Sequence, residues 1–183
     1  MYKVYKKAFT FSPDLEKYII SKARQGDPIF NNRDGEDKDN DNKRIQYDLE
    51  NSNSITTHIS SKLQDIIEHF GYKGTVNDPV ILKSYAYCKR QRLHRDYDLL
   101  QLQKIDESEY PHGIIVGISN NCRFIVSPDG LSRKYVHFDK GDVVIFRGDT
   151  IHAGAEYHTE NIRMHAYIDT ESHDRIKNET FYV

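Results

Sequence analysis

The sequence predicts a mainly β domain, a sandwich or barrel of short strands with two helices packed on one face. Two amphipathic patterns of helical period lie within the first 75 residues. Beyond them, short apolar runs separated by turn residues continue to about residue 169, with no helical pattern between them. Strands that follow one another in this way form antiparallel sandwiches or barrels, and 183 residues suffice for one such domain.

The two helices are marked by their ends as well as by their period. In the first, Ser12 is a good N-cap, Pro13 fits the first helical position and Gly26 is the stop signal. The second covers about residues 53–70, with Gly71 directly after it. Its apolar stripe consists of Ile55, Ile59, Leu63, Ile66, Ile67 and Phe70.

Residues 31–44, between the two helices, contain no apolar side chain. Such a segment cannot bury enough surface to fix one conformation, so we expect a mobile loop that could act as a lid over a substrate. Residues 1–75 would then comprise the helical support and this loop.

The strand-like runs occupy eight segments, most of them separated by turn residues. The segments are residues 80–87, 92–96, 113–119, 122–127, 134–138, 142–146, 151–156 and 162–169. No internal repeat or linker divides the chain. We therefore expect a single domain over residues 1–183, with its β core at 80–169 and a C-terminal tail at 170–183.

Composition excludes several classes of protein. The formal net charge of −2 gives no bulk attraction to nucleic acid. No apolar run approaches the roughly 18 residues of a membrane span, and residues 1–7 lack the apolar region of a secretory signal. Two cysteines, Cys88 and Cys122, cannot make a disulfide framework. We expect a soluble intracellular protein, cytoplasmic or nuclear, with no membrane partner.

Candidate metal ligands occur on two of the predicted strands. His94 and Asp96 are two residues apart, so their side chains point to the same face of a strand. His152 stands at the head of a later strand. Two histidines and one carboxylate form the facial triad of non-haem Fe(II) oxygenases, which leaves coordination positions open. The His-x-Asp pair alone is weak evidence, but the distal His152 strengthens it.

Arg163, eleven residues after His152, is a candidate anion-binding residue. Arg163, His165 and Tyr167 share one face of the last strand, and Ile162, Met164, Ala166 and Ile168 share the other. A buried guanidinium without a partner is costly. A bound dicarboxylate would supply the partner, because the guanidinium fork matches a carboxylate. The alternative is an internal salt bridge to Asp or Glu.

These residues together resemble the core of the Fe(II)/2-oxoglutarate-dependent dioxygenases. The resemblance is carried by His94-x-Asp96, the run from Gly141 to Asp149, His152-Ala153-Gly154 and Asn161-x-Arg163, and it covers about residues 80–169. It implies a double-stranded β-helix (jelly-roll) fold, with Fe(II) on His94, Asp96 and His152 and the 2-oxoglutarate C5 carboxylate on Arg163. It also implies that O₂ and 2-oxoglutarate hydroxylate or demethylate a substrate, with decarboxylation to succinate and CO₂.

Two further residues are candidates for contacts in this site. Tyr85 resembles the Tyr of an Asn-x-Tyr segment that helps hold 2-oxoglutarate in the alkylated-base demethylases, although Lys83 replaces the Asn. The second Arg of that branch has no counterpart, which argues against base demethylation. The alternative is that Tyr85 fills the barrel. His165 would either contact cosubstrate or substrate, or be a hydrogen-bonded core residue.

The substrate and two other functions stay open. We expect a protein or peptide side chain first, a small molecule second and nucleic acid third, since no nucleic-acid-binding module is visible. A cupin-like metalloenzyme without redox chemistry would use Zn, Mn or Ni on the same jelly roll, but such sites more often show three or four His with a Glu. A non-enzymatic jelly-roll binding module would typically have lost a triad member. Metal analysis and 2-oxoglutarate turnover distinguish these functions.

Overall fold

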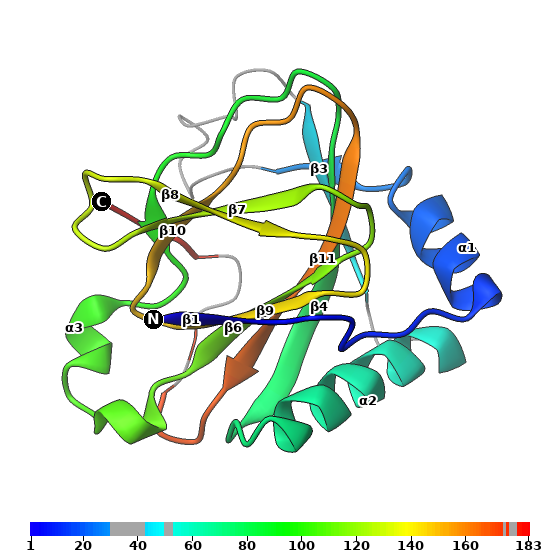
Figure 1. Ribbon diagram of the computed structural model, residues 1–183. Helices are drawn as coiled ribbons and strands as arrows, with labels where there is room; N and C mark the ends of the chain where they lie inside the picture. Colours follow the sequence, from blue (N-terminus) through cyan, green and yellow to red (C-terminus); the bar gives the residue numbers. More distant parts are fainter. Residues whose placement is uncertain (30–42, 50–52, 174, 176–178) are drawn as a thin grey trace.

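Two antiparallel sheets face each other in the computed structural model, which describes residues 1–29, 43–49, 53–173, 175 and 179–183 (Figure 1). The larger sheet has the order β1-β9-β6-β11-β4-β3-β2 and the smaller one β12-β5-β10-β7-β8. All neighbouring strands within both sheets are antiparallel. This is a jelly-roll architecture, and the predicted fold class is confirmed.

The strand bounds are as follows. The larger sheet consists of β1 (Tyr2–Tyr5), β9 (Val143–Arg147), β6 (His112–Gly117), β11 (Asn161–Asp169), β4 (Thr75–Ser84), β3 (Arg44–Asp48) and β2 (Asp27–Pro28). The smaller sheet consists of β12 (Phe181–Tyr182), β5 (His94–Arg95), β10 (Ile151–Gly154), β7 (Cys122–Ser127) and β8 (Lys134–Phe138).

Both predicted helices form where their capping signals place them. Helix α1 spans Pro13–Lys22, and the Ser12 hydroxyl accepts a hydrogen bond from the backbone N–H of Leu15. Helix α2 spans Ser54–His69, and Asn53 caps it through a reciprocal box with Thr56. A short helix α3 (Leu99–Leu102) and a 3₁₀ turn (Glu107–Glu109) follow β5 and were not expected.

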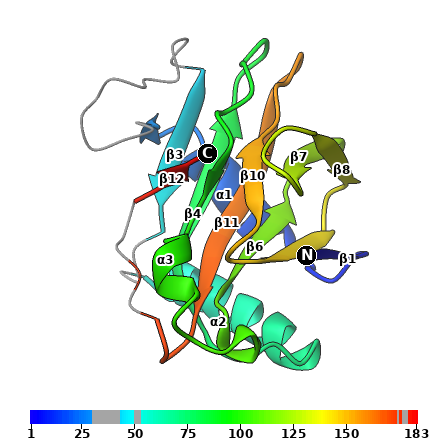
Figure 2. The ribbon, with the colours of Figure 1, turned by 90° about the vertical axis from the view of Figure 1, so that its left-hand side faces the viewer.

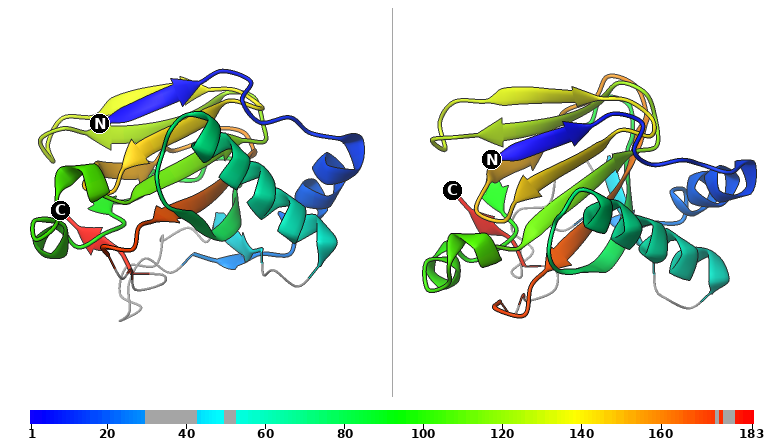
Figure 3. Two further views of the ribbon diagram at one scale, coloured as in Figure 1. Left: turned by 90° about the horizontal axis from the view of Figure 1, so that it is seen from below. Right: turned by 60° about the horizontal axis from the view of Figure 1, so that its bottom comes forward.

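The main core lies between α2 and the outer face of the larger sheet, and Figure 3 shows α2 running along this sheet. The predicted alternation of β11 supplies one side of the core, because Ile162, Met164, Ala166 and Ile168 all pack there. Leu63 and Ile67 of α2 are buried against them. The other face of β11 is thereby directed between the two sheets.

The predicted strand bounds agree best with the structure in the middle of the chain. Strands β7 and β8 have the predicted bounds, whereas β4 begins at Thr75 and β5 is only two residues long. Strands β1, β2, β3 and β12 were not expected. Strand β12 returns the C-terminal segment to the smaller sheet, where Tyr182 pairs with His94 (Figure 2). None of the helices within the described ranges is long and apolar enough to cross a membrane.

Only the end of the expected loop 31–44 lies within the described residues. Residues 30–42 lie outside the described residues. Arg44, which the prediction assigned to the loop, instead begins β3 and is completely buried. The correction follows from the residues after it, because Ile45, Tyr47 and Leu49 alternate with Arg44, Gln46 and Asp48 at the period of a strand.

Candidate metal centre and its cavity

His94, Asp96 and His152 come together between the two sheets. Strand β5 pairs with β10 so that His94 lies directly opposite His152, and their ring centroids are 4.5 Å apart. Asp96 Oδ1 lies 3.8 Å from His94 Nε2 and 3.5 Å from His152 Nε2. One ligand atom from each of the three buried residues lies within 4.8 Å of the others. The spacing therefore suits three ligands of a single metal ion.

The two imidazoles are oriented by backbone carbonyls. His94 Nδ1 lies 2.8 Å from the carbonyl oxygen of Arg92, and His152 Nδ1 lies 2.9 Å from that of Thr150. A carbonyl only accepts hydrogen bonds, so each ring carries a proton on Nδ1 and directs Nε2 toward Asp96. Histidines that bind metals are commonly fixed in this way through their second nitrogen.

The charge states of His94 and Asp96 also suit a divalent cation. Burial, reinforced by the neighbouring His152, lowers the pKa of His94 to about 4, so this ring is neutral at neutral pH. Burial alone would raise the pKa of Asp96, but His152 and hydrogen bonds from His152 and His165 hold it well below its ordinary value. An ionised carboxylate beside imidazole nitrogens is a donor set that binds Fe(II). The residues present thus fit the metal that the sequence implies.

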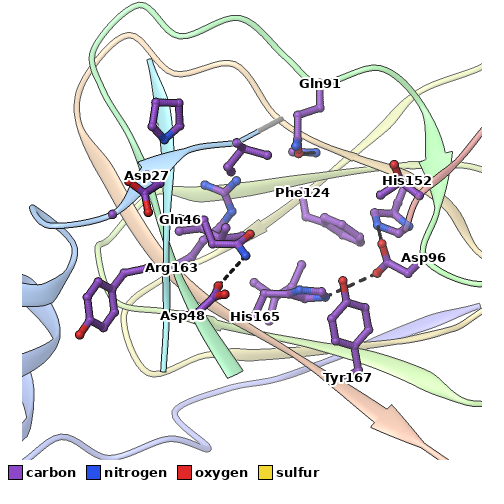
Figure 4. Close-up of a pocket in the computed structure, with 18 of the residues that line it drawn as sticks. Asp27, Gln46, Asp48, Gln91, Asp96, Phe124, His152, Arg163, His165 and Tyr167 are labelled. Carbon is purple, nitrogen blue, oxygen red and sulfur yellow. Dashed lines mark hydrogen bonds and ion pairs between the residues drawn. The ribbon is translucent and has the colours of Figure 1, made fainter. Parts of the chain in front are cut away.

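A cavity of about 680 Å³ extends from these three residues between the sheets. Figure 4 shows Asp96 and His152 at one end and Asp27 and Gln46, from β2 and β3, at the other. Between the ends, the cavity wall is formed by side chains of both sheets, among them Phe124, Phe146, Arg163, His165 and Tyr167.

Arg163 lines this cavity and is 3% exposed. Its Nη1 donates a hydrogen bond to Ser84 Oγ at 3.1 Å, and its guanidinium lies 5.7 Å from the ring centroid of Tyr157. No carboxylate within the described part of the chain forms an ion pair with Arg163. The alternative of an internal salt bridge therefore finds no described partner, and the guanidinium is available to a ligand anion.

His165 and Tyr167 lie near the candidate metal ligands. His165 Nε2 is 3.5 Å from Asp96 Oδ2, which is the second oxygen of that carboxylate. The two ring centroids of His165 and Tyr167 are 4.8 Å apart. His165 thus lines the cavity and approaches Asp96.

Tyr85 does not line the cavity. Its side chain is 36% exposed, and the ammonium of Lys83 lies 4.6 Å from its ring centroid. Leu82 lines the cavity and Ser84 contacts Arg163, so residues 83 and 85 fall on the opposite face at strand period. Lys83 accordingly pairs with Glu160 at 2.9 Å. The structure brings His94, Asp96, His152 and Arg163 to one cavity but leaves Tyr85 outside it.

Two contributions to the cavity region were missed by the sequence analysis. Arg44 lies behind the cavity wall, where its Nη2 donates to the carbonyl oxygens of Lys89 and Ala155, both at 2.9 Å. Thr180 and Tyr182, from the segment expected as a tail, line the cavity beside His94. The alternating run from Arg44 to Leu49 was a signal for β3, whereas two residues of β12 give no usable pattern.

Comparisons with known proteins relate this chain to others by structure alone. No protein-family model and no curated protein matches its sequence. A prolyl hydroxylase from Trichoplax adhaerens, solved in complex with a hypoxia inducible factor peptide fragment, superimposes with a TM-score of 0.66 at 7% identity, over 93% of this chain and 84% of that one. The non-haem α-ketoglutarate-dependent epimerase SnoN from nogalamycin biosynthesis gives 0.64 at 11% identity, over 92% and 78%.

A third similar structure is an oxidoreductase of the 2OG-Fe(II) oxygenase family from Burkholderia pseudomallei. Its TM-score is 0.60 at 11% identity, over 97% of this chain and 87% of that one. At such low identities the similarity is one of fold. The chain therefore has the fold of the 2-oxoglutarate and Fe(II)-dependent oxygenases, as the sequence motifs predicted.

Proposed function

We propose that this chain is an Fe(II)- and 2-oxoglutarate-dependent oxygenase. The observation that carries the proposal is the convergence of His94, Asp96 and His152, with both imidazoles anchored through Nδ1. The three residues lie at one end of a cavity that also contains the guanidinium of Arg163. The fold is consistent with this chemistry but would not establish it without the site.

In this proposal the chain's residues divide into three roles. His94, Asp96 and His152 hold Fe(II), and Arg163 binds the C5 carboxylate of 2-oxoglutarate. Iron and 2-oxoglutarate, when bound, supply the oxidation of substrate by O₂ coupled to formation of succinate and CO₂. Phe124 and Phe146 pack against His152, with ring centroids at 5.2 and 4.7 Å, and exclude water from one side of the metal ligands.

The test measures succinate from the purified protein supplied with Fe(II), 2-oxoglutarate and O₂. We expect slow, iron-dependent succinate formation by the wild-type protein and none by a folded His152→Ala variant. Binding of 2-oxoglutarate to the metal-loaded protein without turnover would indicate that substrate is needed to start the reaction. Neither binding nor turnover would refute the proposal and favour the cupin-like enzyme or the binding module.

A peptide or protein side chain is the substrate class we propose first. The cavity extends from the candidate metal ligands to exposed Asp27 and Asp48, which also line it. Carboxylates there disfavour a phosphate backbone, which places nucleic acid last. A small molecule is the second candidate, since a cavity of about 680 Å³ is within the usual range for such ligands. Substrate-stimulated succinate formation with peptide and metabolite pools would separate these classes.

A further inference from the structure

We propose that His165 is a positioning residue for the metal centre: it holds one oxygen of Asp96 and so leaves only the other oxygen to the metal ion. The inference rests on the proposed function and deepens it. The sequence motifs and the similarity of fold give His165 no part in metal binding, although its ring lines the same cavity as the three candidate ligands.

The two carboxylate oxygens of Asp96 face different groups. Oδ1 lies 3.8 Å from His94 Nε2 and 3.5 Å from His152 Nε2, so it faces both candidate imidazole ligands. Oδ2 lies 3.5 Å from His165 Nε2. This oxygen is buried, and no other group within the described residues donates a hydrogen bond to it. A buried, ionised carboxylate oxygen without a donor is costly, so His165 is the group that can satisfy it.

The contact between Asp96 and His165 joins the two sheets across the cavity (Figure 4). His94 in β5, Asp96 directly after β5 and His152 in β10 all belong to the smaller sheet. His165 belongs to β11 of the larger sheet, whose alternation directs it inward. The carboxylate of Asp96 therefore has one oxygen toward the imidazoles of its own sheet and the other toward the opposite sheet.

Aromatic neighbours and strand pairing hold the His165 ring in place. The ring of Phe146 stacks with it, with centroids 6.2 Å apart and an interplanar angle of 14°. The ring of Tyr167 meets it edge-on, with centroids 4.8 Å apart and an angle of 74°. The backbone of His165 is paired on both sides, with Val80 of β4 and Ile115 of β6 as its Cα partners. A donor held in this way loses little freedom when it engages the carboxylate.

The interaction proposed for this contact is a charge-assisted hydrogen bond. With its proton on Nε2, His165 donates to Asp96 Oδ2. The separation of 3.5 Å is longer than the roughly 2.7–2.9 Å of such a bond. Contacts between catalytic groups commonly shorten when the complex with ligands forms. A metal ion on Oδ1 would fix the carboxylate with Oδ2 toward His165.

Binding through one oxygen preserves coordination positions at the metal. A carboxylate can bind a metal ion through one oxygen or through both. Three single-atom ligands from the chain leave three positions of an octahedron open, which in the proposed function serve the cosubstrate and O₂. If Asp96 bound through both oxygens, it would occupy one of these positions. A hydrogen bond from His165 makes the second metal–oxygen bond less favourable and keeps Oδ1 directed at the metal.

The test measures Mn(II) dissociation constants, without O₂, for variants that lose or keep the donor. His165→Leu removes the donor and should weaken Mn(II) binding about 10- to 100-fold, as is typical when a hydrogen-bond partner of a metal ligand is lost. His165→Gln keeps an N–H the same number of bonds from the backbone, so it should stay within about threefold of the wild type. His165→Phe keeps a ring without a donor and carries the test if His165→Leu does not fold. His137→Leu removes an exposed histidine of β8 and should leave the affinity unchanged.

Crystal structures of the Mn(II)-loaded proteins give the second readout. We expect Asp96 to bind Mn(II) through Oδ1 alone in the wild type and through both oxygens in His165→Leu. A residue that only filled space between the sheets would not produce this change, and glutamine would not restore the affinity that leucine loses.

The outcomes separate this inference from the proposed function. Equal losses of Mn(II) affinity in His165→Leu and His165→Gln would mean that His165 serves packing alone, and would overturn the inference. Wild-type affinity in a folded variant without the donor, or binding through one oxygen in both crystal structures, would overturn it as well. In each of these cases, Mn(II) and 2-oxoglutarate binding by the wild-type protein would leave the proposed function standing. No Mn(II) binding by the wild-type protein would refute both.

Discussion

A single added methyl group at Gly154 should disrupt cosubstrate binding while leaving the fold intact. Gly154 lies outside the left-handed region of backbone conformation, so alanine suits its backbone. The new Cβ would nevertheless fall within 3.0 Å of Arg44 Nη1, Arg163 Nη2 and Gln91 Oε1, which is closer than ordinary contacts allow. The three side-chain ends must therefore move away from this point, and one of them is the guanidinium of Arg163, which we propose for the C5 carboxylate of 2-oxoglutarate.

The magnitude follows from the contacts at that point. Losing one charged hydrogen bond costs about 1.5–3 kcal/mol, so Gly154→Ala should weaken 2-oxoglutarate binding about 10- to 150-fold. Overpacking of this kind lowers the free energy of unfolding by about 1–3 kcal/mol. In a chain of 183 residues this corresponds to a fall of about 2–12 °C in melting temperature.

The assay is a titration of 2-oxoglutarate into the Mn(II)-loaded protein, with melting temperature measured in parallel. Gly71→Ala is the matched control, because Gly71 has a φ of +76° and a Cβ there would meet nothing within 4 Å. That variant should lose stability through backbone strain but keep its affinity for 2-oxoglutarate. Wild-type affinity in Gly154→Ala would refute the assignment of the C5 carboxylate to Arg163.

Three further predictions concern the metal, the core and acid stability. Mn(II) at 100 times its dissociation constant should stabilise the protein by about 2.7 kcal/mol and raise its melting temperature by about 5–11 °C. The Asp96→Asn variant should show no such rise, and a rise in that variant would exclude Asp96 as a metal ligand. Leu63→Ala, in the α2 core, should cost about 2–5 kcal/mol in urea unfolding without changing 2-oxoglutarate affinity; a cost below 1 kcal/mol would contradict its burial. Burial would raise the pKa of Asp142, but hydrogen bonds from Lys6 and two backbone N–H groups outweigh this and lower it. The stabilisation that Asp142 provides is therefore complete at neutral pH and is lost as the pH falls below about 4. The Asp142→Asn variant should have a lower melting temperature than the wild type at pH 7, and its melting temperature should fall less on acidification. An equal fall in melting temperature for both proteins would contradict this.

The elements predicted correctly from the sequence are those whose signals are local. Helix α2 combines an apolar stripe with a capping residue, and β7 and β8 lie between clear turns. Strand β1 lacks such signals, since its four residues alternate weakly and pair with β9, more than 100 residues away. Edge strands of this kind are specified by their partners, which no local pattern reveals.

The same distinction explains which site residues could be predicted. His94 and Asp96 are two residues apart, which is the period of a strand, and the alternation of β11 places Arg163 on the inner face. Local spacing therefore indicated all three residues. Tyr85 was selected by resemblance to a motif, whereas the alternation of Leu82 and Ser84 would have placed it on the outer face.

Arg44 shows how much the two-residue period of a strand can predict by itself. The run from Arg44 to Leu49 alternates polar and apolar residues, which predicts a strand with Arg44 on its polar face. In the structure, Leu49 on the apolar face belongs to the helix-covered core, so the polar face of β3 is directed between the sheets. The period thus determines that Arg44 points inward, but only the pairing of Arg44 with Ser84, 40 residues later, brings it beside Arg163. The position of a buried arginine that is set by strand register rather than by a motif is found only once the strand pairing is known.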